Sequence, residues 1–147
     1  MAAATSDNRF VKPGKRRATA ESAPLSSPAV DAPRKSRRIL LVEDNADFRE
    51  LPTFVLDSEG YEVDAVAGVD EGLALLHTTR YGLILTDYAL PRRNGHWLLE
   101  QAEAAGFLAD TAAVIVTAHP SVPDAGWRTI RKPIDIDKFL QTVRSLI

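Results

Sequence analysis

Acidic side chains follow two short apolar runs of this sequence at the points where the runs end. Glu43 and Asp44 follow residues 39–42, and Asp87 comes soon after residues 83–85. A short apolar run closed by a carboxylate is typical of a buried parallel strand whose C-terminal end presents that carboxylate. Because open α/β sheets bind ligands at those ends, Asp87 is a candidate functional residue. The alternative is that Asp87 only opens a turn, since Asp is a common turn residue.

Two other polar side chains stand at the ends of later runs. Thr117 closes the apolar stretch 112–116, and Lys132 follows the predicted strand 127–131. In a parallel sheet the carboxyl ends of all strands lie at one edge, so this edge would gather three carboxylates, one hydroxyl and one ammonium. The agreement of four strand ends favours one functional site over several unrelated turn residues.

Three converging carboxylates repel one another unless a cation joins them. Oxygen ligands without imidazole or thiolate suit Mg²⁺ or Mn²⁺, and Mg²⁺ commonly combines carboxylates with water and a phosphate oxygen. A carboxylate can also act as a nucleophile and form an acyl phosphate. The hydroxyl of Thr117 and the ammonium of Lys132 would then stabilise charge on the oxygens of the incoming phosphoryl group.

Five predicted strands alternate with helical segments along residues 37–147. This alternation implies a parallel sheet with right-handed crossovers and helices on both faces. The segment 119–126 is short and contains Pro120 and Pro123, so no full helix is expected there. The predicted strands are 39–42, 61–66, 83–85, 112–117 and 127–131, and the helices begin near residues 45, 70, 95 and 136.

The first helix is expected to begin after a capping residue, Asp44 or Asn45, and to end at Gly60. Pro52 lies inside this helix and is expected to kink it or delay its start. Apolar residues recur at three- and four-residue steps, which predicts a core-facing side made of Phe48, Leu51, Val55 and Leu56.

The composition excludes several classes of protein. The chain has no cysteine, which excludes disulfides, cysteine-bound zinc and thiol catalysis. No apolar run approaches the roughly 18 residues that a membrane span needs. The N-terminus lacks the charge and apolar core of a secretory signal, so a cytoplasmic protein is expected.

The net charge of −2 conceals an asymmetry between the two ends of the chain. Residues 1–38 hold nine Lys/Arg against three Asp/Glu, whereas residues 39–147 hold nine against 17. Residues 1–36, rich in Ala, Ser and Pro, are therefore predicted to be a disordered basic tail before an ordered domain, 37–147. Nucleic acid and the chain's own acidic domain are candidate partners, but the acidic domain disfavours nucleic acid. A solvated tail is the simpler interpretation.

Four motifs occur in a fixed order: Val42-Glu43-Asp44-Asn45, Asp87-Tyr88-Ala89-Leu90-Pro91 with Gly95, Val116-Thr117-Ala118, and Lys132-Pro133. In these motifs and their spacing, residues 37–147 resemble the receiver domain of bacterial two-component response regulators. The resemblance implies a flavodoxin-like, doubly wound, five-stranded parallel sheet of order 2-1-3-4-5, with helices on both faces. The site would lie at the switch point of that sheet.

The resemblance also implies roles for the acidic residues. Asp87 would be the phosphoacceptor, receiving its phosphoryl group from a histidine kinase or a histidine phosphotransfer protein. Mg²⁺ would be held by Glu43, Asp44, Asp87 and the backbone carbonyl of Ala89.

In the second half of the site, Thr117 would follow the phosphoryl group and Lys132 would pair with a phosphoryl oxygen. Lys132-Pro133 would be the family's cis peptide bond. Two features depart from the family. Lys132 comes only 15 positions after Thr117, a shortened connection where the family has its fourth helix. Thr129 stands where the family often has an aromatic residue, so we expect the readout to run through a shortened 118–126 loop.

The expected function is a phosphorylation-dependent signalling module that regulates an unidentified downstream protein by conformational change, not a turnover enzyme. Because the chain ends with the closing helix at Ile147, a single domain without an output domain is expected. One alternative is a pseudo-receiver that binds partners without phosphorylation. A less favoured one is a phosphatase with Asp87 as nucleophile, since Ala89 stands where such enzymes usually carry an acid/base carboxylate.

Overall fold

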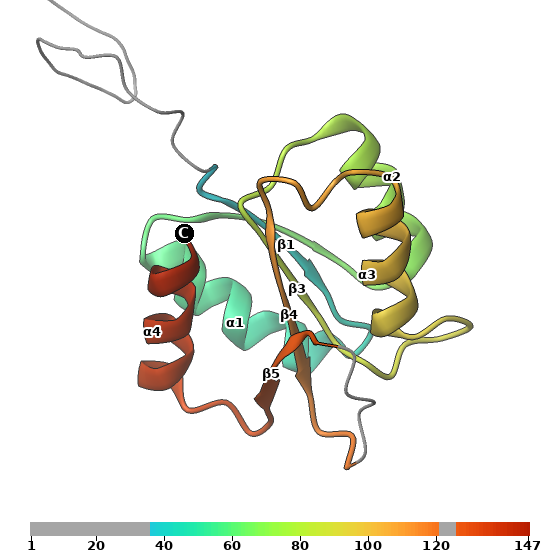
Figure 1. Cartoon of the computed structure of the whole chain (residues 1–147). Helices are drawn as coiled ribbons and strands as arrows, with labels where there is room; N and C mark the ends of the chain where they lie inside the picture. The colour runs from blue at the N-terminus through green and yellow to red at the C-terminus, as the bar shows by residue number, and fades with distance from the viewer. Residues whose placement is uncertain (1–35, 121–125) are drawn as a thin grey trace, which may run out of the picture. The chain divides into compact units, whose positions relative to one another are not determined.

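The computed structural model describes residues 36–120 and 126–147. Within these ranges five parallel strands form one sheet, and four helices cover its two faces (Figure 1). The predicted basic tail lies outside the described residues except for Ser36, as do residues 121–125 of the last loop. The predicted division into a tail and a domain therefore stays a prediction.

All neighbouring strands of the sheet are parallel, and their order is β2-β1-β3-β4-β5. This confirms the predicted fold class and strand order. The strands are β1 Arg38–Val42, β2 Glu62–Val66, β3 Leu83–Thr86, β4 Ala112–Thr117 and β5 Arg128–Arg131. Their carboxyl ends lie at one edge, which is where the sequence analysis placed the site.

Helices α1 and α4 cover one face of the sheet, and α2 and α3 cover the other (Figure 1). Alternate side chains of β1 enter the two cores. Ile39 and Leu41 pack with α1 and α4, whereas Leu40 and Val42 pack with α2 and α3. A strand buried on both faces needs apolar residues at successive positions, which explains the unbroken run. The helices are α1 Ala46–Ser58, α2 Val69–Thr78, α3 Gly95–Ala104 and α4 Ile136–Leu146.

The start of α1 is set by Asn45. Its side chain accepts hydrogen bonds from the amides of Asp47 and Phe48 at 2.9 and 3.1 Å, so Asn45 rather than Asp44 is the N-cap. The helix begins at once and continues through Pro52 to Ser58. Of the two predicted alternatives for Pro52, a kink or a delayed start, the delayed start is therefore wrong.

The predicted core-facing side of α1 is only partly right. Leu56 is fully buried and Val55 is partly buried, but Phe48 and Leu51 are 53% and 47% exposed. Pro52 is itself buried. Pro52 and Leu56, four residues apart, share the face that packs on the sheet. Treating the proline only as a helix breaker removed a core residue from the pattern and misassigned the face.

The connection from β4 to β5 is irregular in its described part. Residues 118–120 contain no helix, as predicted, and residues 121–125 lie outside the described residues. β5 forms an edge of the sheet and is mostly exposed, and Thr129 is one of its exposed residues. Among the helices of the described residues, none is long and apolar enough to cross a membrane.

Candidate functional site

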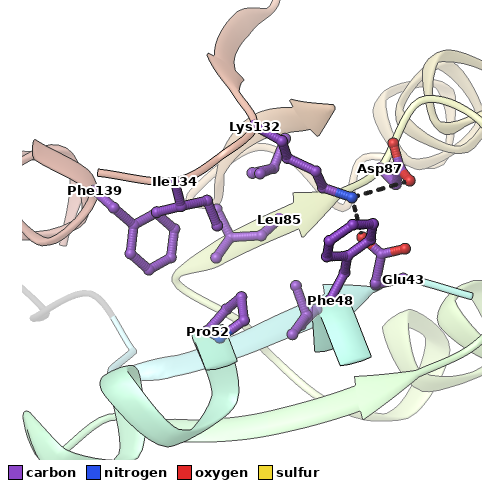
Figure 2. Close-up of a pocket in the computed structure, with 10 residues that line it drawn as sticks. Glu43, Phe48, Pro52, Leu85, Asp87, Lys132, Ile134 and Phe139 are labelled. Carbon is purple, nitrogen blue, oxygen red and sulfur yellow. Dashed lines mark hydrogen bonds and ion pairs between the residues drawn. The ribbon is translucent and has the colours of Figure 1, made fainter. Parts of the chain in front are cut away.

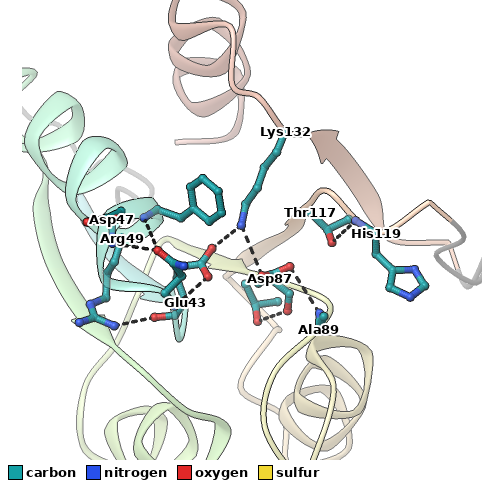
Figure 3. A network of polar contacts seen from close by, with 11 residues as sticks. Glu43, Asp47, Arg49, Asp87, Ala89, Thr117, His119 and Lys132 are labelled. Carbon is teal, nitrogen blue, oxygen red and sulfur yellow. Dashed lines mark hydrogen bonds and ion pairs between the residues drawn. The ribbon is translucent and has the colours of Figure 1, made fainter.

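The carboxyl ends of β1, β3, β4 and β5 bring the predicted site residues together (Figure 3). Backbone hydrogen bonds continue past the strand ends. The Asp87 amide donates to the Val42 carbonyl at 2.9 Å, and the Lys132 amide donates to the Thr117 carbonyl at 3.0 Å. The residues that carry the site are therefore held by the sheet itself, because these bonds fix the first residue after each strand.

Three carboxylates form the acidic part of the site. Glu43, Asp44 and Asp87 each place one carboxylate oxygen within 4.8 Å of the others. Glu43 and Asp87 are buried, whereas Asp44 is exposed to solvent. Oxygen donors at this spacing, with no His or Cys among them, fit a hard divalent cation such as Mg²⁺ or Mn²⁺. Ala89 lies beside them, with its amide 3.4 Å from Asp87 Oδ1, and the use of its carbonyl as a ligand stays a prediction.

Lys132 joins two of these carboxylates (Figure 2). Its Nζ atom lies 2.5 Å from Glu43 Oε1 and 3.3 Å from Asp87 Oδ2. The three side chains are 4–11% exposed, so water screens these ion pairs weakly. The peptide bond between Lys132 and Pro133 is cis, as the resemblance implied. The shorter contact goes to Glu43, a pairing that the sequence analysis did not predict.

Burial raises the pKa of the Glu43 carboxyl above its ordinary value. The hydrogen bonds from Lys132 and from the Asn45 amide lower the pKa, but they do not offset the desolvation, to which the charge of Asp87 adds. A second positive charge at this place would favour the ionised carboxylate. The acidic part of the site is therefore matched to a cation in addition to the lysine.

Thr117 is buried at the end of β4, and its hydroxyl accepts a hydrogen bond from the His119 amide at 3.0 Å. His119 is held at two other points. Its carbonyl accepts a hydrogen bond from the guanidinium of Arg131, and its ring packs against Tyr88 with centroids 5.1 Å apart. His119 thus connects the end of β4 with the loop after β3 and with β5.

Gly95, the first residue of α3, lies against the backbone of Asp87. Its amide donates to the Tyr88 carbonyl at 2.8 Å. A Cβ atom added here would lie 2.1 Å from the Asp87 carbonyl oxygen, a distance that real Cβ contacts do not show. Glycine is therefore required for α3 to start this close to the site, which explains its place in the motif.

Two residues that contact the site were not predicted to do so. Arg49 donates from Nη1 to the Glu43 carbonyl oxygen at 2.8 Å, and so supports the loop that carries the acidic pair (Figure 3). Phe48 places its ring 4.4 Å from Lys132 Nζ. Both lie in the first turn of α1, where apolar periodicity gives no indication of which side chains reach the strand ends. The one feature of the sequence that places them near the site is that they closely follow the capping residue Asn45.

The parallel sheet of order 2-1-3-4-5, with acidic side chains and a lysine at its carboxyl edge, defines a receiver-type α/β protein. The family model of the response regulator receiver domain matches residues 39–144. The chain belongs to this family.

A related regulatory protein supports the assignment. Transcriptional regulatory protein DltR of Streptococcus agalactiae serotype III is 32% identical over 114 residues, which cover 73% of this chain and 50% of DltR. The chain thus spans about half the length of that curated relative.

Solved structures agree. A CheY-like response regulator receiver domain protein from Methanospirillum hungatei JF-1 is 30% identical, with a TM-score of 0.69, 76% of this chain covered and 93% of that one. TrrA from Thermotoga maritima, in complex with Mg²⁺ and BeF, has a TM-score of 0.68 at 24% identity, with 75% and 98% covered, and supports the fold.

Proposed function

We propose that this chain accepts a phosphoryl group on Asp87 from a histidine kinase or a histidine phosphotransfer protein, and regulates a downstream protein by the conformational change that follows. The observation that carries the proposal is the arrangement around one buried carboxylate. Asp87 has two further carboxylates within metal-sharing distance and an ammonium 3.3 Å away. A carboxylate in this setting can act as a nucleophile while its surroundings neutralise the incoming charge.

The proposed transfer uses the Asp87 side chain directly. A carboxylate oxygen attacks the phosphorus of a phosphohistidine, the phosphorus–nitrogen bond breaks, and the histidine nitrogen takes up a proton. Lys132 then turns its ammonium to one phosphoryl oxygen, and the Thr117 hydroxyl donates to another. A Mg²⁺ ion held by Glu43, Asp44, Asp87 and the Ala89 carbonyl would supply the positive charge that draws a phosphoryl oxygen into the site.

The direct test is labelling by acetyl phosphate with Mg²⁺, followed by mass spectrometry of the intact chain. We expect one phosphoryl group on the native chain and none on Asp87→Ala. Asp110→Ala is the matched control, since Asp110 is an exposed aspartate outside the acidic cluster, and it should be labelled like the native chain. An unlabelled native chain would refute the proposal and favour a pseudo-receiver.

We also propose that the modification is read out through His119. The Thr117 hydroxyl accepts from the His119 amide, and the reorientation that lets it donate to a phosphoryl oxygen strains or breaks this bond. The contacts of His119 with Arg131 and Tyr88 would pass the movement to β5 and to the loop after β3. The exposed Thr129 supports this route, because no aromatic ring is available at that position to act as the switch.

The readout is tested by backbone NMR with beryllofluoride and Mg²⁺ as a phosphoryl mimic. We expect the amide signals of residues 117–120 to shift more than those of residues 62–64, which begin β2 at the end of the strand opposite the site. Absence of any change at 117–120, in a sample whose Asp87 signal shows that the mimic is bound, would exclude this route.

Turnover of phosphate esters is not part of the proposal. Receiver domains are signalling modules rather than turnover enzymes, and Ala89 provides no acid/base group two residues after Asp87. A sustained release of phosphate from an aryl phosphate that is lost in Asp87→Ala would establish the phosphatase alternative instead.

A further inference from the structure

Phe48 occupies an unusual position for an aromatic residue on an amphipathic helix. It is 53% exposed, so it is not a core residue. Its ring nevertheless lies over the ammonium of Lys132, with Nζ 4.4 Å from the ring centroid (Figure 2). A lysine ammonium within about 6 Å of a ring face is attracted by the negative charge on that face. The ring therefore contacts a residue of the site rather than the core.

The start of α1 holds the ring in this place. Asn45 accepts a hydrogen bond from the Phe48 amide, which fixes Phe48 in the first turn. Side chains of a helix lean toward its N-terminus, and the N-terminus of α1 lies at the carboxyl edge of the sheet. Pro52, one turn later, is buried and lines the same small cavity as Phe48. The ring is thus directed over the strand ends, with the buried Pro52 beside it in the cavity lining.

The ring completes the surroundings of the Lys132 ammonium. Glu43 and Asp87 approach Nζ as ion-pair partners, and the Lys132 side chain is only 9% exposed although it lies at the surface end of the sheet. The lysine and the ring line a cavity of about 10 Å³, which has room for about one water at most. Glu43 and Asp87 also line it, and the remaining six lining residues are apolar: Leu41, Pro52, Leu85, Val116, Ile134 and Phe139. The polar groups among these lining residues, Glu43, Asp87 and Lys132, already pair with one another, so water that enters from the side of α1 would gain little from hydrogen bonds.

We propose that Phe48 is a positioning residue of the phosphorylation site, which holds the Lys132 ammonium toward Asp87 and excludes water on the side of α1. The proposal rests on the proposed function, because its consequence concerns the lifetime of the aspartyl phosphate. In hydrolysis, water attacks phosphorus and the bond from phosphorus to the Asp87 oxygen breaks, which gives back the carboxylate and releases dihydrogen phosphate. Phe48 slows this reaction by limiting the approach of water from the side of α1.

Two substitutions separate the two effects. Phe48→Leu keeps apolar bulk but lacks the ring face, and Phe48→Ala lacks both. Phe54 provides matched controls, because it lies on the same helix, is 71% exposed and does not line the cavity. The measurements are the decay rate of the ³²P-labelled aspartyl phosphate with Mg²⁺, and the ¹H shift of the Lys132 Cε protons in the unphosphorylated chain.

We expect the aspartyl phosphate to decay about threefold faster or more in Phe48→Ala, because water then reaches the site from the side of α1. Phe48→Leu, which keeps part of the apolar bulk, should lie between that variant and the native chain. Phe54→Ala and Phe54→Leu should decay at the native rate. The Lys132 Cε protons should lie upfield in the native chain, because the attached Nζ lies over the Phe48 ring. They should lose that displacement in Phe48→Leu but not in Phe54→Leu. A loss of stability alone would not produce this pattern.

The assignment would be overturned if the aspartyl phosphate of Phe48→Ala or of Phe48→Leu decayed at the native rate. It would also be overturned if the ¹H shift of the Lys132 Cε protons were unchanged in Phe48→Leu. If the native chain is not labelled at all, the proposed function fails, and the NMR shift still decides whether Phe48 contacts Lys132 in solution. Failure of the function and failure of this inference are therefore distinguishable.

Discussion

Replacing Lys132 with methionine tests directly how much the buried ion pairs of this lysine contribute to the stability of the folded chain. The substitution keeps a long apolar side chain but removes the ammonium that lies 2.5 Å from Glu43 and 3.3 Å from Asp87. Both carboxylates would remain in place, next to each other and next to Asp44. We therefore expect Lys132→Met to lower the free energy of unfolding in the absence of divalent cations.

The size of the loss follows from burial. Removing one partner of a buried ion pair costs about 3–5 kcal/mol, because the remaining charge keeps its desolvation penalty. The side chains of Glu43, Lys132 and Asp87 are 4%, 9% and 11% exposed, so solvent screening is weak. Glu43 can bind a proton in the variant, which removes part of the desolvation penalty. We therefore expect a loss in free energy of unfolding at the lower end of this range, about 3 kcal/mol at neutral pH.

The loss should depend on pH with a definite sign. Burial already raises the pKa of Glu43 in the folded chain, and removing Lys132 removes a hydrogen bond that lowers it. A raised pKa means that the folded chain holds a proton which the unfolded chain releases. The stability that Lys132→Met loses should therefore be smallest below about pH 4.3, the pKa of Glu43 in the unfolded chain. It should grow as pH rises through the pKa of Glu43 in the folded variant.

The assay is urea unfolding followed by tryptophan fluorescence, with EDTA and with Mg²⁺. Mg²⁺ should reduce the difference in free energy of unfolding between Lys132→Met and the native chain, because it supplies positive charge and no longer competes with the ammonium. A ligand at 100 times its Kd raises the free energy of unfolding by about 2.7 kcal/mol. Lys138→Met, at an exposed position on α4, is the control and should stay within about 0.5 kcal/mol of native. A deficit of Lys132→Met below about 1 kcal/mol in EDTA, unchanged by Mg²⁺, would refute the reasoning.

Three further expectations concern the residues that support the site and the sheet. Gly95→Ala should cost about 2–4 kcal/mol in thermal unfolding, since its Cβ would lie 2.1 Å from the Asp87 carbonyl oxygen; a native Tm would contradict the contact. Asn45→Ala should cost about 1 kcal/mol and speed amide hydrogen exchange in the first turn of α1, because two capping hydrogen bonds are lost. Burial raises the pKa of Tyr81, whose hydroxyl also donates to Asp64. Native stability should therefore fall as pH rises above about 10, the pKa of an unfolded tyrosine, and Tyr81→Phe should show a shallower fall in alkaline urea titrations.

The sequence alone determined the sheet and the place of the site. Unbroken apolar runs identify strands buried on both faces, and alternation with helices leaves few topologies because crossovers are right-handed. Once the strands are parallel, the residues that follow them must meet at one edge. Asp87, Thr117 and Lys132 were therefore predicted to come together although they lie far apart along the chain.

Tertiary structure decided which atoms pair at that edge. Spacing cannot show that the Lys132 ammonium lies closer to Glu43 than to Asp87, because this depends on the exit angles of two loops. Nor can periodicity place Phe48, which was predicted to face the core and instead lies over the lysine. The rotation of α1 about its axis is set by the packing of Pro52 and Leu56 on the sheet, and packing of side chains from distant segments is information that no local pattern contains.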